Sequence, residues 1–467
     1  MKLNFWGANR QVTGSRYCVD AGGQQVMIDC GMVQERPFLD RNWAMNPIPA
    51  NEIDALLLTH VHIDHTGLLP KLVREGYRGP IYATEPTVEL SEIVLRDAAN
   101  IQSEDSDYKQ RRHREENRKG GSYPISPLFT SHDVDTTLPL FTSVKYREPI
   151  RVNDCMTATF YDAGHILGSA MIELLVRENG KDSRILFSGD IGQWDKPLIH
   201  DPTLFEQADY VVMESTYGDK DHEKAGDIET QFANIINETL DRGGNVVIPT
   251  FAVERAQELM FYISRLVHAK KIPLVKVFLD SPMAVDVTEI YRRCDNCFDE
   301  ETTAMLEANR PPLRFPGLTM ARTTNESKAI NNYKKPCIIM ASSGMCTAGR
   351  IKHHLRLNIG RPESTILFVG YQGVGTLGRQ ILEKNDIVRI HGGQYKVKAQ
   401  VRQIYGFSGH ADRTGLLHWL GNLKQAPKQI FLTHGDEAVA LNLAQQITDR
   451  WHWPVTVPHY KDCVELT

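Results

Sequence analysis

The amino-acid sequence predicts an α/β protein, and three features of the chain point to this class. Short apolar runs separated by glycines dominate the first 205 or so residues, as is typical of strands joined by turns. From about residue 206 the apolar runs alternate with amphipathic helical patterns, which favours a parallel sheet flanked by helices. Several runs end in a histidine or an aspartate, so polar side chains are expected at strand ends. A length of 467 residues predicts two or three domains.

The amino-terminal part is predicted to contain strands bounded by glycine-rich turns. The run 56–58 ends in Thr-His-Val-His-Ile-Asp-His, and a helical pattern follows over 68–73. Asn179-Gly180 joins two runs and predicts a β-hairpin. The predicted strands of this part are 3–6, 16–20, 25–29, 56–58, 80–84, 156–161, 171–177 and 183–187, with a long helix over 87–101.

The remaining elements alternate in type, as expected for strands that are joined by crossover helices. Their predicted strands are 210–213, 246–249, 275–279, 336–340, 365–369, 396–405 and 429–432. The helical patterns cover 228–240, 253–268, a segment that ends near 423, and 438–450.

Composition restricts the class of protein further. No apolar run approaches the roughly 20 residues that span a bilayer, and the first residues lack the long apolar core of a signal peptide. The eight cysteines are scattered. Cys294 and Cys297 form the one close pair, and we expect them to be reduced bystanders. These features predict a protein of the reducing cytoplasm.

The net charge of −5 argues against broad electrostatic attachment to nucleic acid. A local basic groove stays compatible with it, because the local field depends on where the charges lie. The basic run Lys109–Arg114 is followed by Glu115 and Glu116. We therefore expect a solvated helix face there rather than an RNA-binding patch.

The histidine-rich sequence after the strand 56–58 has the residue types of a metal site. Neutral imidazole and carboxylate are groups that Zn²⁺ binds in hydrolytic sites. His60 and His62 alternate and so can reach one metal ion. Asp64 and His65, beyond the strand, can turn toward a second ion. Two later strands also deliver such residues at their ends, namely His165 and Asp190.

Together these motifs resemble the metallo-β-lactamase superfamily, and more narrowly its β-CASP nuclease branch. The first signature is His60-x-His62-x-Asp64-His65, followed by His165 and Asp190. The acidic motif that opens the β-CASP insertion is matched by Glu214-Ser-Thr-Tyr-Gly-Asp. The second and third motifs are matched by Gly-Phe-Ser-Gly-His410 and by Leu-Thr-His434-Gly-Asp, and a Ser-Ser-Gly-Met turn by 342–345. The resemblance covers essentially the whole chain.

The resemblance implies a four-layer αβ/βα sandwich built from residues 1–205 and 396–467. The β-CASP domain, residues 206–395, is inserted between these two parts. The active site is expected in the cleft between the sandwich and the inserted domain. We expect no separate nucleic-acid-binding domain at either end.

By the same resemblance, the cofactors are two Zn²⁺ ions. The ligands of the first ion are His60, His62 and His165, those of the second are Asp64, His65 and His434, and Asp190 bridges both. Mn²⁺ is an alternative, because sites of histidine and aspartate accept several first-row ions. Two such ions lower the pKa of a bridging water and neutralise charge on a phosphate group.

The implied reaction is hydrolysis of phosphodiester bonds in RNA, with single-stranded RNA as the partner. The catalytic residues are His410 as general acid, Glu214 as the carboxylate that orients it, and Asp64. A histidine in the third motif goes with RNA-cleaving members of the family, whereas a valine marks DNA-processing ones. Small turn residues are suited to bind phosphate oxygens, and the candidates are Ser408, Ser342, Ser343 and Gly344.

Two other functions fit parts of the pattern. A hydrolase of a small thioester or lactam would bind metal but leaves Glu214, His410 and the inserted residues without a use. A non-catalytic scaffold would need no metal, although every expected ligand type is present. The arginines 255, 350 and 379 are expected either to line a substrate groove or to lie on solvated surface. The glycines of 373–378 are expected to form a turn.

Overall fold

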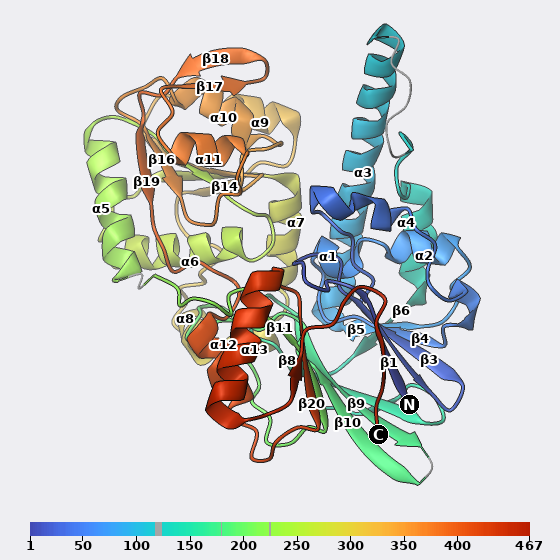
Figure 1. Ribbon diagram of the computed structural model, residues 1–467. Coiled ribbons are helices and arrows are strands. Elements are labelled where there is room, and N and C mark those ends of the chain that lie inside the picture. Colours follow the sequence, from blue (N-terminus) through green and yellow to red (C-terminus); the bar gives the residue numbers. More distant parts are fainter. Residues whose placement is uncertain (117–123, 179, 224–225) are drawn as a thin grey trace. The chain divides into compact units, whose positions relative to one another are not determined.

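The computed structural model describes residues 1–116, 124–178, 180–223 and 226–467, which form two compact units (Figure 1). Unit 1 comprises Met1–Asp195, Asp201–Asp221 and His410–Thr467. Unit 2 comprises Lys196–His200 and His222–Gly409. Both units contain sheets and helices, so the prediction of an α/β fold is confirmed.

Within the described residues, unit 1 contains two seven-stranded sheets. The first has the strand order β22-β1-β2-β3-β4-β5-β6, and the second has the order β21-β20-β11-β10-β9-β8-β7. The strands of the first sheet are β1 (Lys2–Gly7), β2 (Arg16–Ala21), β3 (Gln24–Ile28), β4 (Ala55–Leu57), β5 (Ile81–Thr84), β6 (Phe141–Val144) and β22 (Cys463–Glu465). Those of the second are β7 (Ile150–Arg151), β8 (Met156–Asp162), β9 (Ala170–Glu178), β10 (Lys181–Phe187), β11 (Tyr210–Glu214), β20 (Gln429–Thr433) and β21 (Val455–Thr456).

Alternating apolar side chains explain how the two sheets pack face to face. In β3, Val26 and Ile28 lie in the core between the sheets, whereas Met27 lies in the core on the opposite face. In β11, Val212 points into the central core and Val211 into the core on the outer side. Because successive side chains point to opposite faces of a strand, each sheet also has an apolar outer face that must be covered.

Helices cover both outer faces of the sheets, which gives the four-layer sandwich. Leu72 of α2 and Leu95 of α3 pack in the core on the first sheet. Trp419 of α12 and Leu443 of α13 pack in the core on the second. The helices of unit 1 are α1 (Ile63–Thr66), α2 (Leu69–Arg74), α3 (Glu85–Glu116), α4 (Ser131–Thr137), α12 (Arg413–Leu420) and α13 (Glu437–Trp451), with 3-10 turns η1 (Arg36–Asn42), η2 (Ala50–Glu52) and η3 (Leu138–Leu140).

In its described part, unit 2 contains a six-stranded sheet in which all neighbouring strands are parallel. The order is β14-β13-β15-β12-β16-β19. Every residue of β12, β15 and β16 is buried, as expected for a parallel sheet with helices on both faces. The strands are β12 (Val246–Pro249), β13 (Lys276–Asp280), β14 (Leu318–Met320), β15 (Cys337–Ala341), β16 (Thr365–Phe368) and β19 (Gln400–Gln403).

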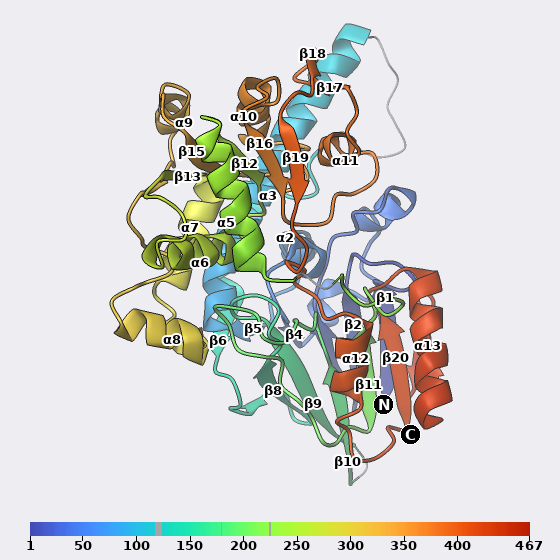
Figure 2. The same cartoon turned by 90° about the vertical axis from the view of Figure 1, so that its left-hand side faces the viewer.

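Helices surround this sheet, and a small hairpin packs with two of them (Figure 2). Leu355 of α10, Ile381 of α11 and Val388 of β17 share one core cluster with Val247 and Ile366 of the sheet. The other elements of unit 2 are α5 (Ile228–Asp241), α6 (Arg255–His268), α7 (Pro282–Tyr291), η4 (Asp295–Cys297), α8 (Glu300–Glu307), α9 (Thr324–Ile330), α10 (Ile351–Asn358), α11 (Leu377–Leu382), β17 (Ile387–Ile390) and β18 (Gly393–Lys396).

Some elements differ from the sequence prediction. Helix α3 ends at Glu116, well beyond the predicted 101. The side chains of residues 112–123, which include part of the basic run Lys109–Arg114, lie outside the described residues, as does Asn179 of the predicted turn. Strands β9 and β10 pair antiparallel as the hairpin predicts. The compact units divide at 221/222 and 409/410, whereas the predicted domain boundaries lie at 205/206 and 395/396.

Among the described residues, no helix has the length and apolar character that crossing a membrane requires. Helix α3 is long enough, with 32 residues, but many of them are charged.

Candidate metal centre

Strand direction explains why distant segments of unit 1 meet at one place. In the second sheet, β8, β10, β11 and β20 all run in the same direction, so their carboxyl ends share an edge. His165, Asp190 and His434 follow β8, β10 and β20, and Glu214 ends β11. In the first sheet, His60 comes soon after β4.

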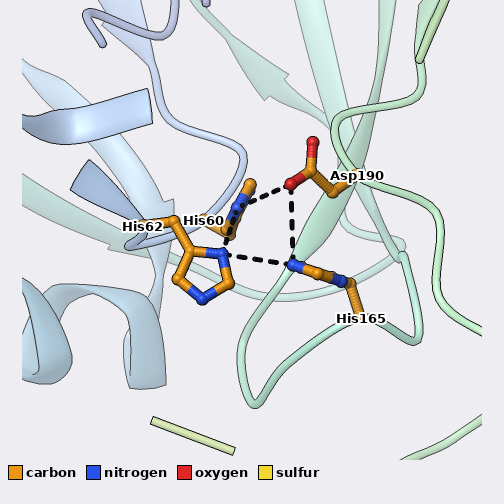
Figure 3. A group of neighbouring side chains, drawn as sticks. All are labelled: His60, His62, His165 and Asp190. Carbon is orange, nitrogen blue, oxygen red and sulfur yellow. Dashed lines mark hydrogen bonds and ion pairs between the residues drawn. The ribbon is translucent and has the colours of Figure 1, made fainter. Parts of the chain in front are cut away.

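Four predicted ligands form a first cluster, His60, His62, His165 and Asp190 (Figure 3). Their ligand atoms all lie within 4.8 Å of one another. The Nδ1 atom of His62 is 3.1 Å from His60 Nε2 and 3.2 Å from His165 Nε2. The Oδ2 atom of Asp190 is 3.3 Å from His60 Nε2 and 3.5 Å from His165 Nε2. Three imidazole nitrogens and one carboxylate oxygen therefore gather around a common point.

Three further predicted ligands form a second cluster, Asp64, His65 and His434. The Nε2 atom of His434 is 3.3 Å from Asp64 Oδ2. The other oxygen of Asp190, Oδ1, is 3.2 Å from His65 Nε2 and 3.5 Å from His434 Nε2. Asp190 thus lies between the clusters and directs one carboxylate oxygen toward each.

The atoms of these clusters fit divalent metal ions. His65 Nε2 and Asp190 Oδ1 are buried, and apart from their own contact at 3.2 Å neither has a hydrogen-bond partner in the described part of the chain. Buried polar atoms nearly always have a hydrogen-bond partner or another ligand, so we expect these two atoms to bind a group such as a metal ion. Imidazole nitrogens and carboxylate oxygens are the ligands that first-row divalent metals take. The residues present therefore have the donor types for a metal ion at each cluster.

The protonation of the first cluster also suits a metal. Burial lowers the pKa of His60 and of His165, and it lowers the pKa of His62 to about 3. These rings are therefore neutral at pH 7 and offer a lone pair. Burial alone would raise the pKa of the Asp190 carboxyl, but the surrounding histidines hold it well below its usual range.

Three family models match successive parts of the chain. A metallo-beta-lactamase superfamily domain matches residues 18–192, a Beta-Casp domain matches 256–381, and a Zn-dependent metallo-hydrolase RNA specificity domain matches 394–458. Ribonuclease TTHA0252 of Thermus thermophilus is 39% identical over 450 residues, which are 96% of each chain. The chain belongs to the β-CASP branch of the metallo-β-lactamase superfamily.

Other similar proteins cover nearly the whole chain. An RNase J-like protein of Methanocaldococcus jannaschii is 28% identical over 98% of this chain and 97% of its own. Transcription termination factor FttA of Methanosarcina mazei is also 28% identical, over 96% of this chain and 69% of its own. A crystal structure of a protein of unknown function from Enterococcus faecalis V583 has a TM-score of 0.55 at 11% identity, over 100% and 99% of the two chains, and shows a similar fold alone. As a β-CASP protein, this chain is a metal-dependent hydrolase of the nuclease type.

The predicted acid of this β-CASP protein lies beside the first cluster. The Nδ1 atom of His410 is 3.1 Å from Glu214 Oε1, and the amide of Ile191 donates to the same oxygen at 2.6 Å. The Nε2 atom of His410 is 4.0 Å from Asp190 Oδ2. Burial by itself would lower the pKa of His410, but the Glu214 carboxylate leads the neighbours that raise it to about 9. The imidazole therefore carries a proton at neutral pH.

The predicted substrate-binding residues all belong to unit 2, namely Ser342, Ser343, Gly344 and Ser408. The first three follow β15 directly, and the Ser342 hydroxyl donates to Ser281 Oγ at 3.0 Å. Ser408 is half-buried and stands two residues before His410. Contact of these four residues with substrate stays a prediction.

The three arginines that were expected at a groove or on the surface differ from one another. Arg255 is buried in an ion pair with Glu258, and its guanidinium lies 5.5 Å from the centre of the Phe407 ring. The expectation of solvated surface is therefore wrong for Arg255. Arg350 donates to Asp280 at 2.8 Å, and Arg379 is half-exposed. The glycines of 373–378 form the predicted turn, which leads into α11.

Polar residues that the sequence did not point to hold two predicted ligands in place. The Oδ2 atom of Asp29 is 2.7 Å from His65 Nδ1, and the same carboxylate accepts hydrogen bonds from the amide and hydroxyl of Thr59 at 2.8 Å. The hydroxyl of Thr216 is 3.0 Å from His434 Nδ1. Such partners fix the orientation and tautomer of a metal-binding histidine. The available signal for Asp29 was its position at the end of a predicted strand.

A close backbone approach at Gly192 joins two of the loops that carry the clusters. The amide of Gly192 donates to the carbonyl of Ala163 at 2.9 Å. A Cβ atom at 192 would lie 1.6 Å from the carbonyl oxygen of Gly164, so a side chain is excluded here. Glycine thus lets the loop that follows Asp190 pack on the loop that carries His165.

Proposed function

We propose that this β-CASP protein is a ribonuclease that hydrolyses phosphodiester bonds of RNA with two Zn²⁺ ions. The observation that carries the proposal is the placement of Asp190, which directs one oxygen toward each cluster. A carboxylate between two metal sites is suited to bridge two ions. The relatives named ribonuclease and RNase J-like, and the match to an RNA specificity domain, support RNA as the substrate.

In this proposal each cluster holds one ion. His60, His62 and His165 would hold the first ion, Asp64, His65 and His434 would hold the second, and Asp190 would contribute an oxygen to each. Histidine and carboxylate ligands suit Zn²⁺, and Mn²⁺ is the alternative. When bound, the two ions supply positive charge that lowers the pKa of water and neutralises the phosphate oxygens. Asp64 contributes to catalysis through its role as a ligand.

The protein side chains complete the reaction. His410 donates its proton to the oxygen that leaves when the P–O bond breaks, a task suited to an imidazole that is protonated near neutral pH. Glu214 keeps that proton on the ring and fixes the orientation of the ring, since it is itself held by the Ile191 amide. Ser342, Ser343, Gly344 and Ser408 contribute hydrogen bonds to phosphate oxygens.

The alternatives are less well supported. A small-molecule hydrolase gives no role to the His410–Glu214 pair. A scaffold gives no reason for His65 Nε2 and Asp190 Oδ1 to be buried 3.2 Å apart with no other hydrogen-bond partner among the described residues. We further propose single-stranded RNA as the substrate and the cytoplasm as the compartment. The eight free cysteines fit a reducing environment.

End-labelled single-stranded RNA and DNA of the same sequence test this function directly. The purified protein should shorten the RNA and leave the DNA intact. A chelator should stop the reaction, and added Zn²⁺ should restore it. RNA cleavage that is indifferent to the chelator would contradict the metal mechanism. Turnover of a thioester or lactam without RNA cleavage would favour the small-molecule alternative.

A further inference from the structure

The parallel sheet of unit 2 carries aromatic side chains at its carboxyl edge. Phe251 comes two residues after β12, Tyr371 three residues after β16, and Tyr405 two residues after β19. These strands are neighbours in the sheet, and all run in the same direction. Three adjacent strands therefore deliver an aromatic residue to the same edge. Ligands of open parallel α/β sheets bind at this edge.

The three rings are accessible. The exposed fraction is 44% for Phe251, 61% for Tyr371 and 44% for Tyr405. Large apolar side chains that remain exposed close together usually mark a binding surface.

The predicted phosphate-binding turn contacts two of the loops that carry these rings. A Cβ atom at Gly344 would lie 2.7 Å from Cδ2 of Phe251, so the phenyl ring rests on this glycine. The side chain of Gln372, next to Tyr371, is buried and donates to the carbonyl of Gly344 at 3.0 Å. The turn after β15 thus contacts both the Phe251 ring and the loop that presents Tyr371.

The position of Tyr405 follows from the strand pairing. The amide of Ile404 donates to the carbonyl of Phe368 at 3.0 Å, which continues the ladder between β19 and β16 one residue past the end of β19. Tyr405 therefore starts beside the segment that leads to Tyr371. The guanidinium of Arg379, on α11, lies close enough to Tyr371 for an electrostatic interaction.

We propose that Phe251, Tyr371 and Tyr405 form a stacking surface for the bases of single-stranded RNA. The proposal rests on the ribonuclease function and adds a substrate-binding surface in unit 2. An aromatic ring stacks on any base, so such a surface binds RNA of many sequences but requires unpaired bases.

The chemistry of this edge favours RNA over a protein partner. The loops that follow β15 and β16 at this edge also carry hydroxyl groups and glycine backbone, from Ser342, Ser343, Gly373 and Gly375. An RNA strand presents apolar base faces and anionic phosphates side by side, so it uses both kinds of group. A protein interface of similar size would have a more continuous apolar centre.

Leucine substitutions test the stacking surface, because leucine is apolar but has no ring. Tyr371→Leu and Tyr405→Leu should each weaken binding of a nuclease-resistant, phosphorothioate-linked single-stranded RNA by about tenfold in fluorescence anisotropy. Tyr371→Phe should retain the affinity of the wild type. In RNA cleavage, the leucine variants should raise KM and leave kcat unchanged.

Tyr333→Leu is the matched control. Tyr333 is an exposed aromatic residue of the same unit, but it precedes β15 and so stands at the opposite edge of the sheet. This variant should bind RNA as the wild type does. An RNA that carries abasic sites should bind the wild type and Tyr371→Leu equally, because it has no bases to stack.

The outcomes separate this proposal from the ribonuclease function. If the wild type cleaves RNA and the leucine variants bind RNA with unchanged affinity, the stacking surface is wrong and the ribonuclease function stands. If the wild type binds RNA with the predicted aromatic dependence but does not cleave it, the ribonuclease function fails alone. If the leucine variants change self-association in gel filtration but not RNA affinity, the edge is a contact between copies of this chain, which also overturns the proposal.

Discussion

The two ring nitrogens of His410 face different carboxylates. Nδ1 lies 3.1 Å from Glu214 Oε1, and Nε2 lies 4.0 Å from Asp190 Oδ2, which belongs to the first cluster. Replacing this residue by alanine removes the proposed proton donor and none of the proposed metal ligands. We expect His410→Ala to slow RNA cleavage by about 100-fold or more. Single-turnover cleavage measures the rate, and atomic absorption should show an unchanged metal content.

His418→Ala is a matched control for this variant. His418 is exposed on α12, and its ring contacts Trp194 rather than either cluster. The control should cleave RNA at the wild-type rate. Cleavage at that rate by His410→Ala as well would show that His410 is not the acid.

Asp29 is a buried partner of the proposed metal ligand His65. Asp29→Asn keeps the size of the side chain but removes the charge that faces His65 Nδ1. Losing such a partner of a metal-binding histidine lowers metal affinity by about 10–100-fold. Competition with a chelator measures this affinity. Asp40→Asn, at an exposed position of η1, should leave the affinity unchanged.

The candidate metal ligands could be predicted where a local sequence pattern points to them. His60 and His62 follow an apolar run at alternate positions, and that pattern needs no tertiary structure to be recognised. Asp29 contacts His65, which is 36 positions away in the sequence. The residues next to Asp29 in the sequence do not indicate this contact. The burial of Arg255 likewise depends on Phe407, which no local pattern connects to it.

At the scale of elements, Asp280 joins the end of β13 to two helices. Its carboxylate accepts hydrogen bonds from Arg350 at 2.8 Å and Ser327 at 2.6 Å, and it lies 2.6 Å from His354 Nε2. Asp280→Ala would leave these groups without their buried acceptor. We expect it to lower the free energy of unfolding of unit 2 by about 3–5 kcal/mol, as measured by urea denaturation.

The contribution of the Asp280 carboxylate to stability should depend on pH. Burial by itself would raise the pKa of Asp280, but the hydrogen bonds from His354, Ser327 and Arg350 outweigh burial and lower it. Because the folded-state pKa lies below the unfolded value of about 3.9, this stabilisation is present above that pH and is lost as the pH falls through the folded pKa. The wild type should therefore lose more stability than Asp280→Ala on acidification below about pH 4.

Asp286→Asn is the control for Asp280. Asp286 makes an ion pair with Arg322 at 3.0 Å, and both side chains are about half exposed. An exposed pair of this kind contributes at most about 1 kcal/mol. A loss as large as that of Asp280→Ala would mean that burial is not the cause of the effect.

Elements were predictable from sequence when their pattern was long or repeated. The alternation of apolar runs and helical patterns predicted the parallel sheet of unit 2, and its strands β12, β13, β15 and β16 lie within a residue of their predicted ends. The short elements α9, β17 and β18 were missed, because tertiary packing rather than local periodicity stabilises them. Helix α3 continues past its last apolar position because charged residues such as glutamate and arginine are themselves good helix formers.

For the whole molecule, the proposed ligands connect separate parts of the chain. They span His60 to His434 and follow β4, β8, β10 and β20. A metal that binds this arrangement and not the unfolded chain must stabilise unit 1. A chelator should therefore lower the unfolding temperature of unit 1 by roughly 5–10 °C in calorimetry. The Asp190→Ala variant should have lost metal already and should respond little to the chelator. An unchanged unfolding temperature of the wild type would argue against metal binding in this unit.

The division of the chain into units depends on strand pairs between distant segments. Strand β11 pairs with β10 and β20, and β19 pairs with β16, so pairing decides the unit to which each belongs. Strand β20 lies more than 200 residues after its partner β11 in the sequence, and no local pattern predicts that they pair. Asp190, Glu214 and His434 instead lie at or just after the end of a strand, a position that local sequence reveals whichever sheet the strand joins.

Anomalous X-ray diffraction at the zinc absorption edge, from crystals of the purified protein, would locate the metal ions on either side of Asp190. We predict two strong anomalous peaks, one among His60, His62 and His165 and the other among Asp64, His65 and His434, with the Asp190 carboxylate between them. A single peak, or peaks remote from Asp190, would rule out a two-ion centre that shares this carboxylate.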